Sequence, residues 1–392
     1  MIETWRWFGP ADPITLKAIA QAGAVGIVTS LHHIPTGEAW PLEEVQARKR
    51  LIDDAGLSWS VIESIPVHND IKLRKGNFQS LLANYKASLR SVGEAGVKVV
   101  CYNFMPVVDW TRTDLKFKLP HEVQALGFDM TDFAAYDIHV LQRAQAKADY
   151  AKEVVNRAEK RFQCLSKEQI TDLEKNIIAG LPGGEGSYSR EEIRDAIAEF
   201  VALGEEGFRQ NLNLFLQEVV PVAEEVGIRL CIHPDDPPFS LFGLPRVVST
   251  AEDVRALLAA APSPANGLTL CAGSFGARGD NNLVEMAQEF AEHIHFVHLR
   301  NVKRQDDGSF YEAEHLNGDN DMVGLIKALL KEQNRRHLEG RSDALIPMRP
   351  DHGHLLGDEA ESQGVNPGYS YLGRLKGLAE LRGVICGLSY QG

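Results

Sequence analysis

The chain has 392 residues, of which 44% are hydrophobic and 24% charged, the composition of an ordinary globular protein. Acidic residues outnumber basic ones by 54 to 41, and the formal charge of −13 argues against a nucleic-acid partner, which would need a basic face. No stretch approaches the roughly 18 apolar residues of a membrane span, and the N-terminus lacks a signal-peptide pattern. The five cysteines form no CxxC pair. We therefore expect a cytoplasmic protein without a membrane partner.

The first hundred residues alternate strand-like and helix-like runs. Strands are expected at residues 4–8, 26–31, 59–65 and 97–105. Helices are expected at about 12–22, 41–55 and 77–95. Gly23, Gly56 and Gly96 each fall a few residues before a strand, where the C-cap of a helix is expected.

The segment from about 107 to 188 follows the fourth strand and is far too long for a normal connection. Helical spacing is present at 131–160 and again at 165–178, and the glycine-rich stretch 180–189 predicts a turn before a helix from about 190 to 203. We therefore expect a mostly helical insertion that serves as a lid, an oligomer contact or both.

Four more strand–helix pairs follow the insertion. Strands are expected at 228–233, 268–271, 295–302 and 344–351, and helices near 252–260, 282–292, 322–333 and 372–381. Alternation of this kind implies right-handed crossovers and a parallel sheet, and eight strands suit closure into a barrel. No Gly-x-Gly-x-x-Gly follows the first strand, which argues against a dinucleotide fold. The predicted fold is a single α/β domain over 1–392, a (β/α)8 TIM barrel with the insertion after strand 4.

Four good metal donors end the last four strand runs: His233, Cys271, His298 and Asp351. A lone buried histidine or cysteine is usually a core residue, but here four donors occupy equivalent ends of four successive strands. The C-terminal ends of barrel strands meet at one mouth, where barrel enzymes build their sites. Imidazole, thiolate and carboxylate suit Mn²⁺, Fe²⁺, Co²⁺ or Zn²⁺, so this set predicts one divalent metal site.

Other polar residues at strand ends are candidates for binding a substrate. The alternation of side chains along a strand places His298 on the face opposite His293 and His295, which favours His298 as the ligand. Three arginines lie on or just after strand ends, and each could clamp a carboxylate or form a structural ion pair; they are Arg6, Arg300 and Arg349. His32, after the second strand, could face the same mouth, although a solvated pair with His33 is an equal alternative.

The chain resembles the mannonate dehydratases of the UxuA type over essentially its whole length. The segments that carry the resemblance are TWRWFGP (4–10), GIVTSLHHIPTGEAWP (26–41), IHPDDPP (232–238), LCAGSFGARGDN (270–281), HFVHLRNV (295–302), RPDHGH (349–354) and NPGYSYLGR (366–374). The resemblance implies a xylose-isomerase-like barrel that dehydrates D-mannonate to 2-keto-3-deoxy-D-gluconate in hexuronate catabolism with Mn²⁺ or Fe²⁺. We also expect a homo-oligomer.

Carried over motif by motif, the resemblance puts the metal ligands on the four donors already identified and the acid/base residues on His352 and Tyr369. Tyr371 competes for the tyrosine role, because the chain has Gly-Tyr-Ser-Tyr where the family pattern has leucine at the fourth position. His352 could instead only orient Asp351.

The sequence leaves two other functions open. A metal-dependent sugar isomerase or epimerase on the same barrel would favour carboxylates and histidines, so Cys271 weighs against it. A non-catalytic sugar-acid sensor would need no complete ligand set. An apurinic-site nuclease of related fold is disfavoured by the charge of −13.

Overall fold

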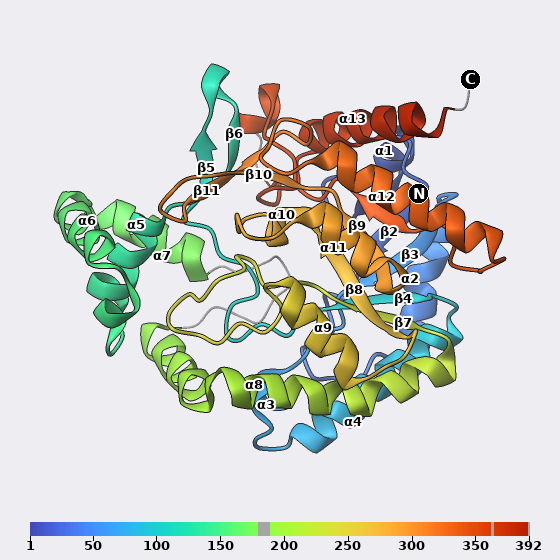
Figure 1. Ribbon diagram of the computed structural model, residues 1–392, viewed down its shortest axis with the longest axis horizontal. Helices are drawn as coiled ribbons and strands as arrows, with labels where there is room; N and C mark the ends of the chain where they lie inside the picture. Colours follow the sequence, from blue (N-terminus) through green and yellow to red (C-terminus); the bar gives the residue numbers. More distant parts are fainter. Residues whose placement is uncertain (179–188, 362–363, 391–392) are drawn as a thin grey trace.

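Eight parallel strands close into a barrel in the computed structural model, which describes residues 1–178, 189–361 and 364–390 (Figure 1). Around the barrel the order is β1–β12–β9–β8–β7–β4–β3–β2. The strands are β1 (Ile2–Arg6), β2 (Gly26–Thr29), β3 (Ser58–Glu63), β4 (Val99–Tyr102), β7 (Arg229–Ile232), β8 (Asn266–Cys271), β9 (Ile294–His298) and β12 (Pro347–Arg349). A barrel strand overlaps each of the eight expected ranges, and the predicted barrel is confirmed.

Helices pack around the outside of the barrel (Figure 1). They are α1 (Leu16–Gln21), α2 (Leu42–Asp54), α3 (Asn69–Leu73), α4 (Phe78–Glu94), α8 (Arg190–Val226), α9 (Ala251–Ala260), α10 (Ala272–Phe275), α11 (Leu283–Glu289), α12 (Met322–Leu338) and α13 (Tyr371–Ser389), with short 3-10 turns at Ala291–His293 and Gly357–Glu361. The expected C-cap glycines adopt positive φ, for example 86° at Gly96 before β4. The helix expected at 190–203 is much longer, because α8 continues beyond a break at Gly204, where φ is 70°.

The interior of the barrel is apolar below its mouth. A layer of buried side chains fills it: Val28, Val61, Val99, Cys101, Cys231 and Phe296. Neighbouring strands run in register there, as when Cys101 pairs with Cys231 across β4 and β7. Close packing of this layer fixes the strand ends above it, which is where the polar residues lie.

A second sheet was not expected from the sequence. It is antiparallel, with the order β10 (Asn301–Arg304), β11 (Phe310–Ala313), β6 (Gln124–Phe128) and β5 (Asp114–Lys118). The single strand expected at 295–302 is therefore wrong: β9 ends at His298, the chain turns at Leu299 and Arg300, and β10 joins the other sheet. Backbone hydrogen bonds to β11 outweigh the continuous apolar pattern that suggested one strand.

The insertion supplies two strands of that sheet and then becomes mostly helical in its described part, as expected. A 3-10 turn, Pro120–Glu122, separates β5 from β6. The helical stretch expected at 131–160 is divided into α5 (Met130–Ala135), a π-helical turn (Tyr136–Leu141), a 3-10 turn (Ala146–Asp149) and α6 (Lys152–Cys164), and α7 (Lys167–Ile178) follows. In Figure 1 these helices form a lobe beside the barrel. Of the turn expected at 180–189, all but Ser189 lies outside the described residues.

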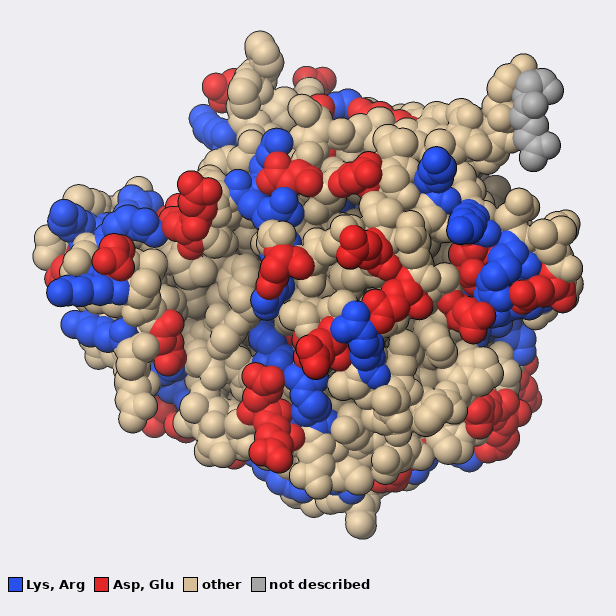
Figure 2. Space-filling view, in the orientation of Figure 1, with Lys and Arg blue, Asp and Glu red and all other residues tan. Residues whose placement is uncertain are grey.

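The surface mixes charges of both signs. Figure 2 shows acidic and basic side chains interspersed over the face that it draws, with basic ones frequent on the lobe of α5 to α7. Within the described ranges, no helix combines the length and the apolar character that a bilayer crossing requires.

Candidate active site

The predicted site residues gather at the C-terminal mouth of the barrel. Cys271 and His298 are the last residues of β8 and β9, and their Cα atoms are register partners. His233 directly follows β7, and Asp351 lies two residues after β12. A cavity opens above them, and eight of the ten predicted residues line it: Arg6, His32, His233, Arg300, Arg349, Asp351, His352 and Tyr369. The other two, Cys271 and His298, are fully buried beside it.

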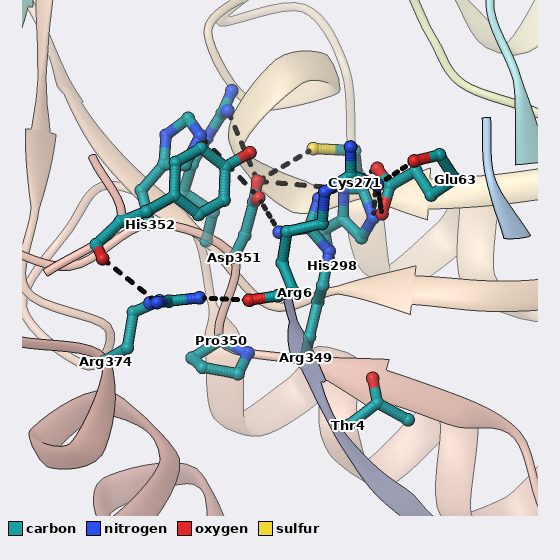
Figure 3. Close-up of polar contacts among 12 residues, drawn as sticks. Thr4, Arg6, Glu63, Cys271, His298, Arg349, Pro350, Asp351, His352 and Arg374 are labelled. Atoms are coloured by element: carbon teal, nitrogen blue, oxygen red, sulfur yellow. Dashed lines mark hydrogen bonds and ion pairs between the residues drawn. The ribbon is translucent and has the colours of Figure 1, made fainter. Parts of the chain in front are cut away.

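Three of the four predicted ligands form a compact group. One donor atom each of His233, Cys271 and His298 lies within 4.8 Å of the others, a grouping that could hold a metal ion. Asp351 adjoins this group, because its Oδ2 atom lies 3.7 Å from His298 Nδ1 and 3.9 Å from Cys271 Sγ. Figure 3 shows the Asp351 carboxylate between the thiol and the arginines.

The hydrogen bonds of the two histidines leave ring nitrogens available. His233 donates from Nδ1 to the carbonyl oxygen of Pro234 at 2.7 Å, which makes Nε2 the nitrogen with a free lone pair. The ring nitrogens of His298 are buried and make only long contacts among the described residues: Nε2 lies 3.4 Å from Glu63 and Nδ1 lies 3.7 Å from Asp351. A buried imidazole without a short hydrogen bond, beside a thiol and a carboxylate, fits a metal ligand.

Two of the predicted substrate-binding arginines are engaged by carboxylates. Arg349 contacts Asp351 at 2.5 Å through Nη1 and donates to Glu63 at 2.8 Å through Nη2. Arg300 donates to Asp236 at 2.7 Å and to Asp351 at 3.3 Å. Gly273 makes room for Arg300, because a Cβ atom at that position would overlap the guanidinium. Both arginines line the cavity, but their structural ion pairs are evident.

Apart from Asp351, the acidic members of this network were not predicted from the sequence. Glu63 is the last residue of β3 and lies 3.4 Å from His298 Nε2, and Asp236 accepts hydrogen bonds from Arg112, Arg300 and Ser274. Glu63 carries the same signal as the metal donors, a polar residue that ends an apolar strand run. Arg112 has no local signal, since it comes from the insertion.

These ion pairs control the protonation of the buried acids. Burial alone would raise the pKa of Asp351, but Arg349, ahead of His352 and His298, outweighs it and holds that pKa well below its ordinary value. The pKa of Glu63 is also well below its ordinary value, because Arg349 and His298 outweigh its burial. Both carboxylates are therefore ionised at neutral pH.

The two predicted acid/base residues face each other in the cavity wall. The rings of His352 and Tyr369 are 4.9 Å apart and nearly perpendicular. His352 donates from Nδ1 to both carboxylate oxygens of Glu312, at 2.7 and 2.8 Å. Tyr371 lies elsewhere, because its hydroxyl donates to the carbonyl oxygen of Ala18 at 3.1 Å. Of the two tyrosines, only Tyr369 lines the cavity.

Arg6, His32 and Phe8 line the cavity next to Tyr369, whose ring packs edge-on against Phe8 at 4.8 Å. Arg6 donates to the carbonyl oxygen of Glu63, and its guanidinium lies 5.0 Å from the Phe8 ring centre. His32 stacks on the same ring, and burial, followed by Arg6 and Arg48, lowers the pKa of His32 to about 3. Its Nε2 atom has no hydrogen-bond partner among the described residues. His33, in contrast, pairs with Glu44 on the surface at 3.1 Å.

Comparisons with known proteins agree over the whole length of the chain. A family model described as D-mannonate dehydratase (UxuA) matches residues 1–391. The mannonate dehydratase of Saccharophagus degradans is 68% identical over 385 residues, 98% of this chain and 97% of that protein. Mannonate dehydratase 2 of Agrobacterium fabrum is 56% identical and covers 98% of this chain and 96% of its own length.

Solved structures give the same result. The crystal structure of mannonate dehydratase from Streptococcus suis serotype 2 has a TM-score of 0.77 at 34% identity and covers 99% of this chain and 95% of its own. A xylose isomerase domain protein from Planctomyces limnophilus, with a TM-score of 0.50 at 11% identity, shares the fold alone; it covers 99% of this chain and 96% of its own. From the family model and the full-length relatives together, the chain belongs to the D-mannonate dehydratase (UxuA) family.

Proposed function

We propose that this hydro-lyase removes water from D-mannonate to give 2-keto-3-deoxy-D-gluconate, a step of hexuronate catabolism, at the mouth of its barrel. The observation that carries the proposal is the convergence of His233, Cys271 and His298 from three successive strand ends, with Asp351 beside them. The full-length relatives named mannonate dehydratase support the choice of substrate.

The proposed cofactor is Mn²⁺ or Fe²⁺, held by His233, Cys271, His298 and Asp351. The free Nε2 of His233 supports this assignment, as does the buried imidazole of His298, which makes only long contacts with carboxylates. The four protein donors would hold such an ion while leaving room on it for substrate oxygens. When bound, such an ion acts as a Lewis acid that stabilises negative charge developing on the substrate carboxylate.

The charge of the network favours an anionic substrate. Four arginines and four carboxylates pair with one another at the cavity and next to it: Arg6, Arg112, Arg300 and Arg349 with Glu63, Asp236, Glu312 and Asp351. Their charges cancel. A divalent ion beside the thiolate of Cys271 would leave one net positive charge, which a sugar-acid carboxylate would neutralise.

The reaction needs a base for the proton on C2 and an acid for the hydroxyl that leaves C3. Burial raises the pKa of Tyr369 to about 12, so its hydroxyl keeps its proton at neutral pH and suits donation to the leaving hydroxyl. His352, with Nδ1 engaged by Glu312, turns Nε2 toward the cavity and suits the base. The hydroxyl departs as water, and the enol that remains moves its O2 proton to C3 to become the keto acid.

The remaining predicted residues bind the sugar acid in this proposal. His32 is neutral at physiological pH, so its unpaired Nε2 can hydrogen-bond a substrate hydroxyl without adding charge. Arg6 lies on the same wall and contributes positive charge toward the carboxylate. The main role of Arg300 and Arg349 is to hold Asp351 in place. They bind substrate only through N–H groups that are not used in their ion pairs.

A cytoplasmic location and a homo-oligomeric state are part of the proposal. Each of the five cysteines, all of them in the described part of the chain, is a free thiol, as expected in a reducing compartment. Light scattering on purified protein tests the oligomeric state.

The decisive experiment is a direct assay. Metal-free protein is incubated with D-mannonate, with and without Mn²⁺, and the formation of a 2-keto-3-deoxy acid is followed at several pH values. Product that depends on added metal supports the proposal. No product under any condition rejects it, and an isomerised sugar acid in its place would favour an isomerase or epimerase.

A further inference from the structure

The four-stranded antiparallel sheet holds the segment that carries His352. Glu312, on β11, contacts His352 Nδ1 with both carboxylate oxygens, at 2.7 and 2.8 Å, and its own carbonyl oxygen accepts from His354 Nε2 at 2.8 Å. One residue later, Leu355 donates to the carbonyl oxygen of Gln124 on β6 at 2.9 Å. Residues 352–355 are thus fastened to this sheet at three successive points.

Glu312 is itself held in place by the insertion. Arg112 donates to Glu312 Oε1 at 3.0 Å and also to Asp236 at 2.8 Å, and the side chains of all three are buried. Burial alone would raise the pKa of Glu312, but His352, ahead of Arg300 and Arg112, outweighs it and lowers that pKa. Trp110, two residues before Arg112, packs edge-on against the His352 ring at 6.1 Å.

The orientation of the imidazole follows from these contacts. With Nδ1 between the two oxygens of a fixed carboxylate, Nε2 is the nitrogen left to face the cavity, and it lies 3.7 Å from Asp351 Oδ1. Without the carboxylate, the ring could rotate about its side-chain bonds or exchange tautomers, and a buried nitrogen would lose its partner.

We propose that Glu312 is a positioning residue for the dehydration, and that the second sheet, built partly from the insertion, exists to fix the His352 ring. This inference rests on the proposed function, because it assigns Glu312 to the base of that reaction. It also explains the first part of the insertion, since Arg112 and β6 belong to the support of the site, whereas the lid or oligomer roles would concern the helical lobe.

The test compares Glu312→Gln with wild type in the metal-loaded enzyme. The amide keeps the shape but accepts from His352 through one neutral oxygen, so kcat should fall about 10- to 100-fold, the usual effect of losing such a partner. KM for D-mannonate and bound metal should stay within about 2-fold of wild type, since Glu312 touches neither. Glu314→Gln is the matched control, because Glu314 is two residues away, exposed, and paired only with Lys376 among the described residues.

Each outcome bears on one proposal. If wild type gives no product, the proposed function fails before any variant is measured. If wild type is active and Glu312→Gln keeps the full kcat, the positioning role is rejected. It is also rejected if metal content falls and KM rises by the same factor as kcat falls. If Glu312→Gln does not fold, Glu312→Asp keeps the negative charge but shortens the reach toward His352 and Arg112. Reduced kcat with normal metal content then supports the role, and wild-type kcat overturns it.

Discussion

Arg349 Nη1 lies 2.5 Å from Asp351 Oδ1, and the opposite edge of the same guanidinium donates to Glu63 at 2.8 Å. The arginine thereby ties the end of β3 to the segment after β12 across the barrel mouth, as Figure 3 shows. All three side chains are largely buried. Asp351 has a φ of 68°, unusual for a residue other than glycine, so this pairing helps to hold it in a strained position.

Replacing Arg349 by methionine should strongly destabilise the protein. Two buried carboxylates would lose their main cation, and breaking a buried ion pair from one side costs about 3–5 kcal/mol. The measurement is the free energy of unfolding of metal-free protein in denaturant. Arg255→Met is the control: Arg255 pairs with Glu289 on the surface, where solvent screens the interaction, so its loss should leave stability nearly unchanged. Equal effects of the two substitutions would contradict the assigned role of Arg349.

Replacing Cys271 by serine should weaken metal binding by at least about 100-fold, more than the 10- to 100-fold typical of losing an outer partner of a ligand. A serine hydroxyl stays protonated and is a poorer donor than a thiolate for the proposed ions. Metal affinity is measured by titration of metal-free protein. Cys386→Ser, at an exposed position near the end of α13, should bind metal as wild type does. Normal affinity in Cys271→Ser would remove the thiol from the ligand set.

Tyr369→Phe should lower kcat by about 100-fold or more, within the range of a lost general acid, whereas Tyr371→Phe should not. Tyr369 lines the cavity next to His352, but the Tyr371 hydroxyl donates to Ala18 on α1. Steady-state rates with D-mannonate separate the two variants. Tyr371→Phe should lose about 1 kcal/mol of stability through its hydrogen bond. A rate loss confined to Tyr371→Phe would reverse the assignment.

The barrel and the metal group could be predicted because both follow from local patterns. Apolar runs that end in a polar residue identified the strands, and parallel closure then brings His233, Cys271 and His298 together without further information. The choice of His298 over His295 needed only the alternation of side chains along a strand. His295 lies on the other face, where burial, ahead of Arg229 and Arg336, lowers its pKa.

The contacts that hold the site residues in place could not be predicted, because they depend on pairings between segments far apart in the sequence. Glu312 meets His352 only after β11 has paired with β6, a strand from a distant part of the chain. Arg112 lies in the first part of the insertion, two residues before β5, where the sequence predicted no particular element. A charged residue in such a segment looks like a surface residue until the topology buries it. Glu63 is different: its position at the end of β3 was a usable signal.

The pH dependence of stability gives a test at His315, whose Nε2 atom lies 2.8 Å from the carbonyl oxygen of Pro350. Burial lowers the pKa of His315 to about 4, whereas the unfolded chain titrates near 6.5. Between these values the unfolded state binds a proton that the folded state does not. The stability that His315 contributes is therefore complete above about pH 6.5 and is lost as the pH falls toward 4.

His315→Gln should remove this difference in proton binding between the unfolded and the folded state. The free energy of unfolding of the metal-free variant should then fall less steeply than that of wild type between pH 6 and 4, by about 1.4 kcal/mol per pH unit. Denaturant unfolding at several pH values measures both slopes. His337→Gln, at an exposed position on α12, is the matched control for the substitution itself. If the free energy of unfolding of His315→Gln and of wild type changed equally with pH, His315 would be protonated in the folded protein as readily as in the unfolded chain. The assigned effect of burial would then be wrong.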